Sequence, residues 1–438
     1  MPRGRTVVLG ACGGIALYKA ASLIGRFREL GATVHVIMTD AATKFVSPLT
    51  FQTLSGNPVH TDLFATPPLW NVEHVALAER ADLGVVAPAT ANIIGKVASG
   101  VADDFLSTTL LAMSCPVLFV PSMNANMYAH PAVKRNLGIL SDYGYEVMTP
   151  DTGRLASGLI GPGRYPETDR ILAVCLRLLG PGDFAGMKVV VSAGPTREFF
   201  DPVRFVSNPS TGRMGFALAA EARRRGAEVV LVAGPTDLKP PEEVTTIRVT
   251  TVGEMRDRIV SEAEGARVVV MAAAPADWLP ATRAAQKMKK AEFPSLSLEL
   301  VPAPDILAEL GQRERGPAAA GEARAHGGRP ALQGVGGPVL VGFAAETQEL
   351  LANAKAKLKA KNVDLMVANQ VATVADQMAA ETDSGFGTET NRVTLLARDG
   401  SIEELPLLSK SEVARAVFDR IARLVGGGDE GHAGVGRP

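Results

Sequence analysis

Two turns built from small residues, at 193–196 and 207–212, share one loop with three arginines, Arg197, Arg204 and Arg213. Short side chains let backbone N–H groups approach an anion, and a guanidinium binds a phosphate or carboxylate through paired hydrogen bonds. An ordinary strand–loop–helix connection with solvated arginines is the alternative interpretation. We interpret the loop as an anion site, because two such turns and three arginines occur together.

Small and polar residues also cluster in the first half of the chain, at 88–92, 99–104 and 121–127. Asp103 and Asp104 are expected at the start of a helix rather than as an acid–base pair, since carboxylates favour helix N-termini. The glycine run at 10–14 lacks Gly-x-Gly-x-x-Gly spacing, which disfavours a dinucleotide site even though Asp40 ends the next predicted strand. The glycine-punctuated segment 153–164 is either a mobile flap or a plain surface loop.

Ionisable residues elsewhere have two interpretations each. The lysine run at 287–290 is either a solvated face or a loop that neutralises a triphosphate. The lysines between 355 and 361 are expected on a helix, where solvation is their default role. A lone histidine such as His74 does not identify a catalytic base by its position.

Apolar runs of strand length alternate with helical patterns in both halves. Predicted strands cover 6–9, 33–39, 83–87 and 116–120 in the first half, and 188–191, 228–233, 268–272 and 339–347 in the second. A predicted helix over 216–225 ends at Gly226. This alternation predicts an α/β protein with two doubly wound, Rossmann-like parallel sheets, whose ligands lie beyond the carboxyl ends of the strands.

Composition limits the function classes. The 438 residues are enough for two or three domains, and a formal net charge of −1 disfavours a nucleic-acid binder. No stretch of about 18 apolar residues is free of charge, so we expect no membrane partner. Three cysteines without metal-ligand spacing fit a reducing, cytoplasmic compartment. The turn-rich segment 180–183 divides a first domain, 1–182, from a second, 183–425, while a Gly/Pro/Ala-rich insertion at about 311–338 and a tail at 426–438 are expected to be disordered.

Taken together, these motifs resemble the bifunctional phosphopantothenoylcysteine decarboxylase/phosphopantothenate–cysteine ligase family of coenzyme A synthesis. The stretches GGIALYK (13–19), HVALAERADL (74–83), APATANIIGK (87–96) and PSMNANM (121–127) resemble its flavin-dependent decarboxylase half. SAGPTRE (192–198), DPVRFVSNPSTGRMG (201–215), ADW (276–278), KMKK (287–290), PDI (304–306) and VGFAAET (341–347) resemble its ligase half. The resemblance implies a flavodoxin-like first domain of the flavin-dependent cysteine decarboxylase type and a ribokinase/Rossmann-like second domain that binds CTP.

For the second half, the resemblance implies that 4′-phosphopantothenate attacks CTP to form an acyl-cytidylate, from which L-cysteine displaces CMP. Mg²⁺ would bind mainly through the CTP phosphates. Asn208, Arg204 and Lys287 would be catalytic. The CTP site would comprise Gly194, Met271, Ala272, Ala273, Asp277, Lys287, Ala303, Pro304, Asp305, Ile306, Phe343, Lys357 and Lys361.

For the first half, the resemblance implies an FMN-dependent decarboxylation that yields 4′-phosphopantetheine, with His74 as the base and Asn124 holding the substrate carboxylate. The FMN site would comprise Gly13, Gly14, Ile15, Thr39, Pro88, Ala89, Thr90, Asn92, Ser99 and Asp103. Many family members have a proton-donating cysteine in the flap, where this chain has Ser157. A thiol gives up a proton more readily than an aliphatic hydroxyl, so we expect a slow final reduction or another acid, such as Tyr165 or water. Cys175 is a poor substitute, because its apolar helix indicates burial.

The family also implies a homo-oligomer in which trimeric decarboxylase units are joined through dimeric ligase units into a dodecamer. Two other functions remain open. The first is a non-catalytic flavoprotein that regulates a partner; the CTP site argues against it, because a regulator does not need one. The second is a nicotinamide oxidoreductase; the missing Gly-x-Gly-x-x-Gly motif argues against it. Flavin absorbance would separate the flavoproteins from the oxidoreductase, and separate assays of CO₂ and CMP would identify the bifunctional enzyme.

Overall fold

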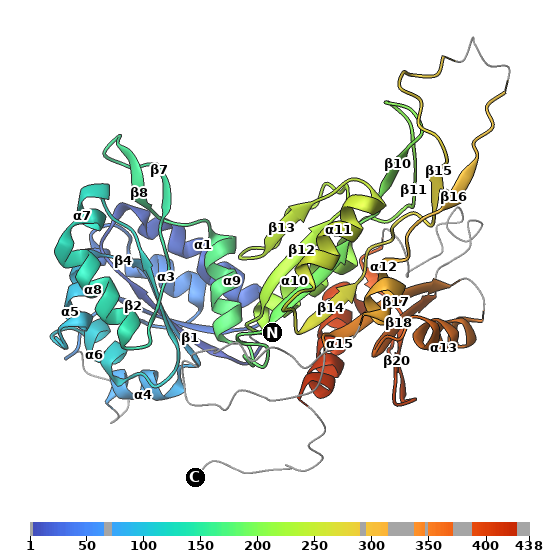
Figure 1. Cartoon of the computed structure of the whole chain (residues 1–438). Coiled ribbons are helices and arrows are strands. Elements are labelled where there is room, and N and C mark those ends of the chain that lie inside the picture. The colour runs from blue at the N-terminus through green and yellow to red at the C-terminus, as the bar shows by residue number, and fades with distance from the viewer. Residues whose placement is uncertain are drawn as a thin grey trace. The chain divides into compact units, whose positions relative to one another are not determined.

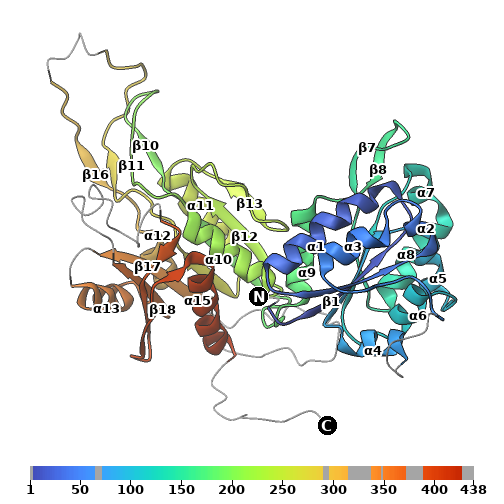
Figure 2. The same cartoon turned by 180° about the vertical axis from the view of Figure 1, so that it is seen from behind.

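The computed structural model describes residues 3–64, 72–289, 295–313, 337–346, 349–370 and 388–426. Within these ranges the chain forms two compact units, Met1–Gly180 and Pro181–Pro438, each a twisted sheet covered by helices (Figures 1 and 2). Most of the predicted insertion, residues 314–336, and the tail from residue 427 lie outside the described residues. The first two residues of the predicted insertion belong to α12 (Ile306–Gln312), and β17 (Val339–Glu346) begins directly after it.

The N-terminal unit contains a parallel sheet in the order β3-β2-β1-β4-β5-β6. This 3-2-1-4-5-6 order is that of the Rossmann sheet, which places a ligand crevice beside β1 and β4, where the order reverses. The doubly wound prediction is therefore confirmed. The strands are β1 (Thr6–Ala11), β2 (Thr33–Met38), β3 (Val59–His60), β4 (Leu83–Ala89), β5 (Val117–Pro121) and β6 (Glu146–Val147).

Helices cover both faces of this sheet because alternate strand residues point to opposite sides. Leu9 packs with α1 (Ala20–Glu29), α3 (Pro48–Ser55) and α9 (Thr168–Leu178), whereas its neighbour Val8 packs on the other side. The helices of that second face are α4 (Glu73–Arg80), α5 (Ala91–Ala98), α6 (Phe105–Ala112) and α8 (Pro131–Asp142). Cys175 on α9 is fully buried, as predicted.

The C-terminal unit repeats the same strand order and then adds two strands. Its sheet runs β13-β12-β9-β14-β17-β18-β20-β21, in which the first six strands are parallel and β20 and β21 are antiparallel to their neighbours. The expectation of a purely parallel sheet is thus corrected. Only residues 398–401 connect β20 and β21, and a parallel pair needs a crossover of a dozen or more residues. The remaining strands are β9 (Lys188–Ala193), β12 (Glu228–Ala233), β13 (Thr245–Arg248), β14 (Val268–Met271), β18 (Leu365–Gln370), β20 (Val393–Ala397) and β21 (Ile402–Glu404).

Two helices, α10 (Arg213–Arg224) and α15 (Lys410–Val425), share one face of this sheet and contact each other. The other face is covered by α11 (Val252–Glu262), α12 and α13 (Leu350–Ala360). Two antiparallel pairs extend the unit, β10 (Arg197–Phe199) with β11 (Phe205–Ser207) and β15 (Trp278–Pro280) with β16 (Leu300–Pro302) (Figure 1). No described helix combines the length and apolar character needed to span a bilayer.

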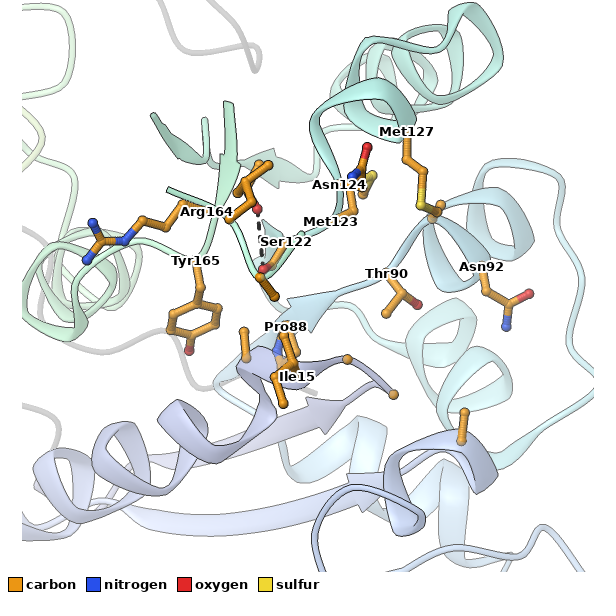
Figure 3. A pocket seen from close by; sticks show the side chains of 18 of the residues that line it. Ile15, Pro88, Thr90, Asn92, Ser122, Met123, Asn124, Met127, Arg164 and Tyr165 are labelled. Carbon is orange, nitrogen blue, oxygen red and sulfur yellow. Dashed lines mark hydrogen bonds between the residues drawn. The ribbon is translucent and has the colours of Figure 1, made fainter. Parts of the chain in front are cut away.

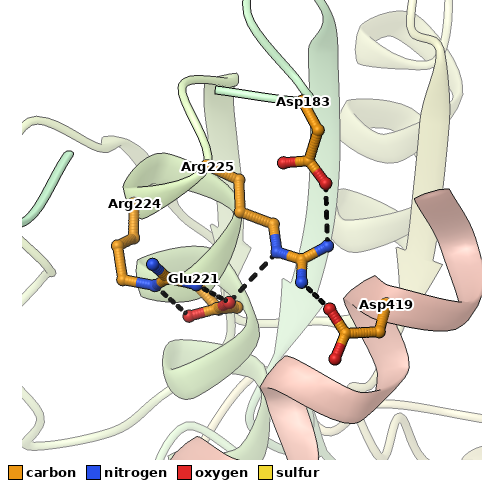
Figure 4. A network of polar contacts seen from close by, with 5 residues as sticks. All are labelled: Asp183, Glu221, Arg224, Arg225 and Asp419. Carbon is orange, nitrogen blue, oxygen red and sulfur yellow. Dashed lines mark hydrogen bonds and ion pairs between the residues drawn. The ribbon is translucent and has the colours of Figure 1, made fainter. Parts of the chain in front are cut away.

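A buried arginine ties α10 to α15 (Figure 4). The Arg225 side chain is 4% exposed and lies 3.2 Å from the Glu221 carboxylate and 3.1 Å from that of Asp183. It also donates a hydrogen bond to Asp419 on α15. Arg224 holds the other side of Glu221 through hydrogen bonds of 2.6 and 2.7 Å. The first residues after the domain boundary and both helices are thereby fixed to one another.

Candidate functional site

A cavity of about 930 Å³ lies at the carboxyl ends of β1, β2, β4 and β5, partly covered by the hairpin of β7 (Asp151–Arg154) and β8 (Ile160–Arg164) (Figure 3). This is where ligands bind in doubly wound sheets. Its lining includes seven of the predicted FMN residues: Gly13, Gly14, Ile15, Thr39, Pro88, Thr90 and Asn92. It also includes Asn124 and Ser157. Ala89, Ser99, Asp103 and His74 are not among the lining residues.

Close backbone approaches shape the cavity wall. A Cβ atom on Gly13 would lie 2.5 Å from the Cβ of Ala41, which is closer than packed atoms approach. Gly163 has φ +124°, and a Cβ there would lie 2.2 Å from the Met123 carbonyl oxygen. Glycine is therefore required at both positions for the β1 loop and the hairpin to close around the cavity.

Lys96 supplies a cation that the sequence analysis missed. Its ammonium lies 2.6 Å from both the Asp103 and the Asp104 carboxylates, and these hydrogen bonds raise the pKa of Lys96. Burial alone would raise the pKa of Asp104. The contacts with Lys96 and the Ser107 amide outweigh this effect and keep the pKa of Asp104 below its usual value. Asp104 caps α6 by accepting from that amide, which confirms the prediction of a helix N-terminus.

Ser157, at the flap position, and Asn124, the predicted ligand of the substrate carboxylate, contact each other in this cavity. Asn124 begins α7 (Ala125–Ala129) and its Nδ2 donates to the Ser157 Oγ at 3.3 Å. Beside them, Tyr165 is 2% exposed and its hydroxyl has no hydrogen-bond partner in the described structure. Burial raises the pKa of Tyr165, which keeps the phenol protonated.

His74 lies on α4, where its ring packs edge-on against Phe105 with the centroids 6.1 Å apart. The structure therefore places the predicted base beside the helix that Asp104 caps rather than in the cavity wall. Burial also raises the pKa of Cys175 well above the usual thiol value, and Cys175 is absent from the cavity lining.

A second cavity, of about 510 Å³, lies in the C-terminal unit at the ends of β14 and β17 and the start of α10. It brings together most of the predicted CTP residues, which come from four separate stretches of the chain. They are Met271, Ala272, Ala273, Asp277, Ala303, Pro304, Asp305, Ile306, Phe343, Lys357 and Lys361. Asn208 lines it as well, whereas Gly194, Arg204 and Lys287 do not.

Asn208 joins two loops of this cavity. Its Nδ2 donates to the carbonyl oxygens of Ala274 at 3.3 Å and Pro275 at 2.9 Å. The backbone of Gly194 packs closely against Gly212 of the same loop. A Cβ atom on Gly212 would lie 3.3 Å from the Gly194 backbone. The glycines thus allow the 207–212 turn to pack on the end of β9.

Arg204 and Lys287 belong to one neighbourhood outside the cavity lining. Arg204 donates to the Met288 carbonyl oxygen at 2.6 Å, so it is fixed to the segment that carries Lys287. The Asp201 carboxylate accepts from the Arg204 and Met288 amides at 2.8 and 3.3 Å. The predicted anion loop is therefore divided between a cavity wall at Asn208 and Arg213 and an adjoining arm at Arg204, where the segment with Lys287 meets it.

Two charged groups of the second cavity pair with each other. The Lys361 ammonium lies 3.1 Å from the Asp305 carboxylate, and Asp305 caps α12 by accepting from the Ala308 amide at 3.0 Å. The sequence analysis missed Asn369, Asn391 and Lys410, which also line the cavity. Among the described residues no group of three His, Cys, Asp or Glu side chains is arranged to hold a metal ion.

Comparison with known proteins matches both units. The family model described as "Flavoprotein" matches residues 1–180, and "DNA/pantothenate metabolism flavoprotein C-terminal domain" matches residues 184–323 and 331–425. The chain is 43% identical to the "Coenzyme A biosynthesis bifunctional protein CoaBC" of Bacillus subtilis (strain 168), covering 97% of this chain and 98% of that protein. The protein of the same name from Mycolicibacterium smegmatis is 40% identical over 97% of this chain and 99% of its own length. The crystal structure of the C-terminal domain of a CoaBC protein is 34% identical, covers 56% of this chain and 98% of that domain, and has a TM-score of 0.42.

Proposed function

Because the chain belongs to the family of coenzyme A biosynthesis bifunctional proteins CoaBC, we propose that each of the two cavities described above carries one of the two reactions. The chain is a bifunctional enzyme of coenzyme A biosynthesis with decarboxylase and ligase activities, as its resemblance predicted. The observation that carries the assignment is the presence of one cavity at the strand ends of each unit. The flavoprotein unit would decarboxylate 4′-phosphopantothenoylcysteine, and the C-terminal unit would make it.

The N-terminal cavity fits a flavin mononucleotide. Its volume of about 930 Å³ suits a planar ring system, and its wall combines apolar groups such as Ile15 and Pro88 with the hydroxyls of Thr39 and Thr90. The unpartnered Tyr165 hydroxyl at the same wall fits a polar ligand. Bound there, FMN would supply two-electron redox chemistry to the substrate's cysteinyl thiol.

The protein groups around that substrate would hold it and move protons. The Asn124 amide would bind the carboxylate that is lost as CO₂, because it projects into the cavity beside the flap. Ser157 would take the position of the proton donor, and Tyr165 is the nearby alternative acid, which remains protonated through burial. His74 would accept the thiol proton as the base.

His74 would be supplied to this cavity by another copy of the chain, because in its own chain it packs against Phe105 and is not among the lining residues. A homo-oligomer with trimeric decarboxylase units linked by dimeric ligase units would provide such a copy.

The C-terminal cavity would bind CTP and couple it to 4′-phosphopantothenate. The substrate carboxylate attacks the α-phosphorus, pyrophosphate leaves, and the cysteine amine then displaces CMP from the acyl-cytidylate. Asn208 would orient the acyl-cytidylate, since its amide is fixed between two loops of the cavity. Arg204 and Lys287 would close on the phosphates from the adjoining arm, and Mg²⁺, held mainly by the CTP phosphates, would offset their charge.

One assay tests both halves. Purified protein is incubated with 4′-phosphopantothenate, L-cysteine, Mg²⁺ and either CTP or ATP, and CMP or AMP, CO₂ and flavin absorbance are followed. We expect CTP-dependent CMP formation, then CO₂ release from a yellow protein. A colourless protein that does not take up FMN would refute the decarboxylase assignment, and turnover with ATP in preference to CTP would refute the nucleotide assignment.

A further inference from the structure

Asp201 is a buried carboxylate that the proposed reaction does not use. It lies in the loop between β10 and β11, and its side chain is 0% exposed. Burial alone would raise the pKa of Asp201, but three backbone amides donate to the carboxylate, outweigh this effect and hold its pKa below the usual value. The side chain is therefore ionised at neutral pH and accepts hydrogen bonds through both oxygens.

The two oxygens of Asp201 have separate partners. Oδ1 accepts from the Val203 and Arg204 amides, at 2.8 Å each, which fixes the turn within its own loop. Oδ2 accepts from the Met288 amide at 3.3 Å, 87 residues further along the chain, and lies 3.7 Å from the Arg204 Nε atom. One oxygen therefore shapes the local turn, and the other holds a different segment.

Met288 is held through both of its backbone polar groups. Its amide donates to that second oxygen, and its carbonyl oxygen accepts from the Arg204 guanidinium at 2.6 Å. Earlier in the same segment, the Ala284 amide donates to the Phe200 carbonyl oxygen at 2.9 Å. Lys287 lies between these two anchors, so its backbone is fixed on both sides while its side chain is exposed. A lysine held in this way loses less conformational freedom when it meets a phosphate.

We propose that Asp201 is a positioning residue of the ligation reaction, which holds Arg204 and the segment of Lys287 where they meet phosphate groups. The proposal rests on the ligase function given above and adds to it the residue that orders two of its cationic groups. Asp201 itself does not touch a substrate, because it does not line the cavity and its negative charge would repel a phosphate. Its effect should therefore pass through Arg204 and Lys287.

The change Asp201→Asn separates the two tasks of the side chain. Asparagine keeps the shape, and its carbonyl oxygen can still accept from the Val203 and Arg204 amides. Its NH₂ group then faces the Met288 amide and the Arg204 guanidinium. These groups are all donors, so the contact with the second segment is lost while the local turn remains.

The matched control is Glu198→Gln, the same change from a buried carboxylate to an amide in the same strand pair. Glu198 lies on β10 and is 6% exposed. Its carboxylate accepts from the Val252 amide at the start of α11, at 2.8 Å. The control therefore reports the cost of removing a buried charge beside the loop without changing the contact to Met288.

The first measurement is hydrogen–deuterium exchange resolved to single amides. In the wild type without nucleotide, we expect the Met288 amide to exchange at least about 10-fold more slowly than an unprotected amide, since its hydrogen bond must open first. In Asp201→Asn that protection should be lost, while the Val203 amide stays protected. In Glu198→Gln both amides should exchange as in the wild type.

The second measurement is CMP formation at saturating substrates, which reports kcat. Asp201→Asn should lower kcat about 100-fold, because a small misplacement of a group that meets the reacting phosphates costs on the order of 10²-fold in rate. The KM of cysteine, CO₂ release from supplied 4′-phosphopantothenoylcysteine and all constants of Glu198→Gln should be unchanged.

Two outcomes would overturn the proposal. One is a folded Asp201→Asn with the wild-type kcat for CMP formation, which would leave Asp201 a structural role only, even if the midpoint of unfolding falls. The other is a wild type whose Met288 amide exchanges at the unprotected rate with and without CTP, which decides the case even if the asparagine variant does not fold. A wild type that forms no CMP would instead refute the ligase function itself, so the two failures are distinguishable.

Discussion

Arg225 is the residue whose loss should destabilise the C-terminal unit most clearly. Replacing it with methionine keeps the side-chain length but removes the guanidinium that contacts Glu221, Asp183 and Asp419. Asp183 and Asp419 are 33% and 52% exposed, so water can hydrate them in the variant, and each pair contributes about 0–1 kcal/mol. Glu221 is 8% exposed and cannot be hydrated without local unfolding.

The magnitude follows from that one carboxylate. Removing one partner of a buried ion pair costs about 3–5 kcal/mol, and Glu221 keeps its two hydrogen bonds from Arg224. We therefore expect Arg225→Met to lower the free energy of unfolding of the C-terminal unit by about 3 kcal/mol, the low end of that range. The double variant Glu221→Gln/Arg225→Met should recover part of the loss, because no uncompensated buried charge remains.

The assay is urea unfolding of the full chain, followed by circular dichroism together with CMP formation and flavin absorbance, so that the transition of each unit is recognised. The control is Arg313→Met, whose guanidinium is 44% exposed and pairs with Glu309 at 3.5 Å; we expect at most about 1 kcal/mol there. A loss below 1 kcal/mol in Arg225→Met, or a shift of the flavin-reported transition instead, would refute the reasoning.

Three further predictions concern the proposed sites. Ser157→Cys should speed the final reduction of the decarboxylation product by about 10²-fold, the low end of general acid catalysis, and leave CMP formation unchanged; a wild type that already reduces the product at the variant's rate would contradict it. Asn208→Asp or Lys287→Gln should abolish CMP formation while CO₂ release from supplied 4′-phosphopantothenoylcysteine continues; loss of both activities would mean that the units are not independent. Gly13→Ala should weaken flavin retention, measured as flavin absorbance after desalting, because the new Cβ would lie 2.5 Å from Ala41. The control Gly25→Ala should keep the flavin, because a Cβ there has no atom within 4 Å. Equal retention in the two variants would show that flavin binding does not require glycine in the β1 loop.

The fold could be predicted from the sequence wherever a local pattern determined the structure. The apolar run at 228–233 became β12 with the same bounds, and the predicted helix at 216–225 is α10, which begins three residues earlier. Asp104 was expected at a helix start and is the N-cap of α6, because a carboxylate there satisfies free backbone amides. The antiparallel β20 and β21 were missed, since the Asp399-Gly400 turn was not recognised as a hairpin signal.

The cavities could be predicted only in part, because their walls are assembled over long sequence distances. Loops directly after strands were found, since the carboxyl ends of parallel strands meet at one edge. Lys96 and Lys410 were missed because each lies on a helix, where an isolated lysine is normally solvated. Their burial depends on helix packing, which the local sequence does not specify. A lysine at the first position of a helix, as in the Ser409-Lys410 pair, is an unusual charge placement and could have served as a signal.

The two units show how one topology can carry two cavities with different walls. Both have the strand order 3-2-1-4-5-6, and both have their cavity at the strand ends, so the scaffold does not distinguish them. The walls differ because other elements supply them. In the first cavity, hydroxyls and apolar groups lie beside cations, of which Lys96 is paired with two aspartates. In the second, the start of α10, the loop after β14 and two lysines at the end of α13 form much of the wall. Among the described residues, neither β20 nor β21 contributes to that wall, so the loops and helices, and not the added strands, give the second cavity its character.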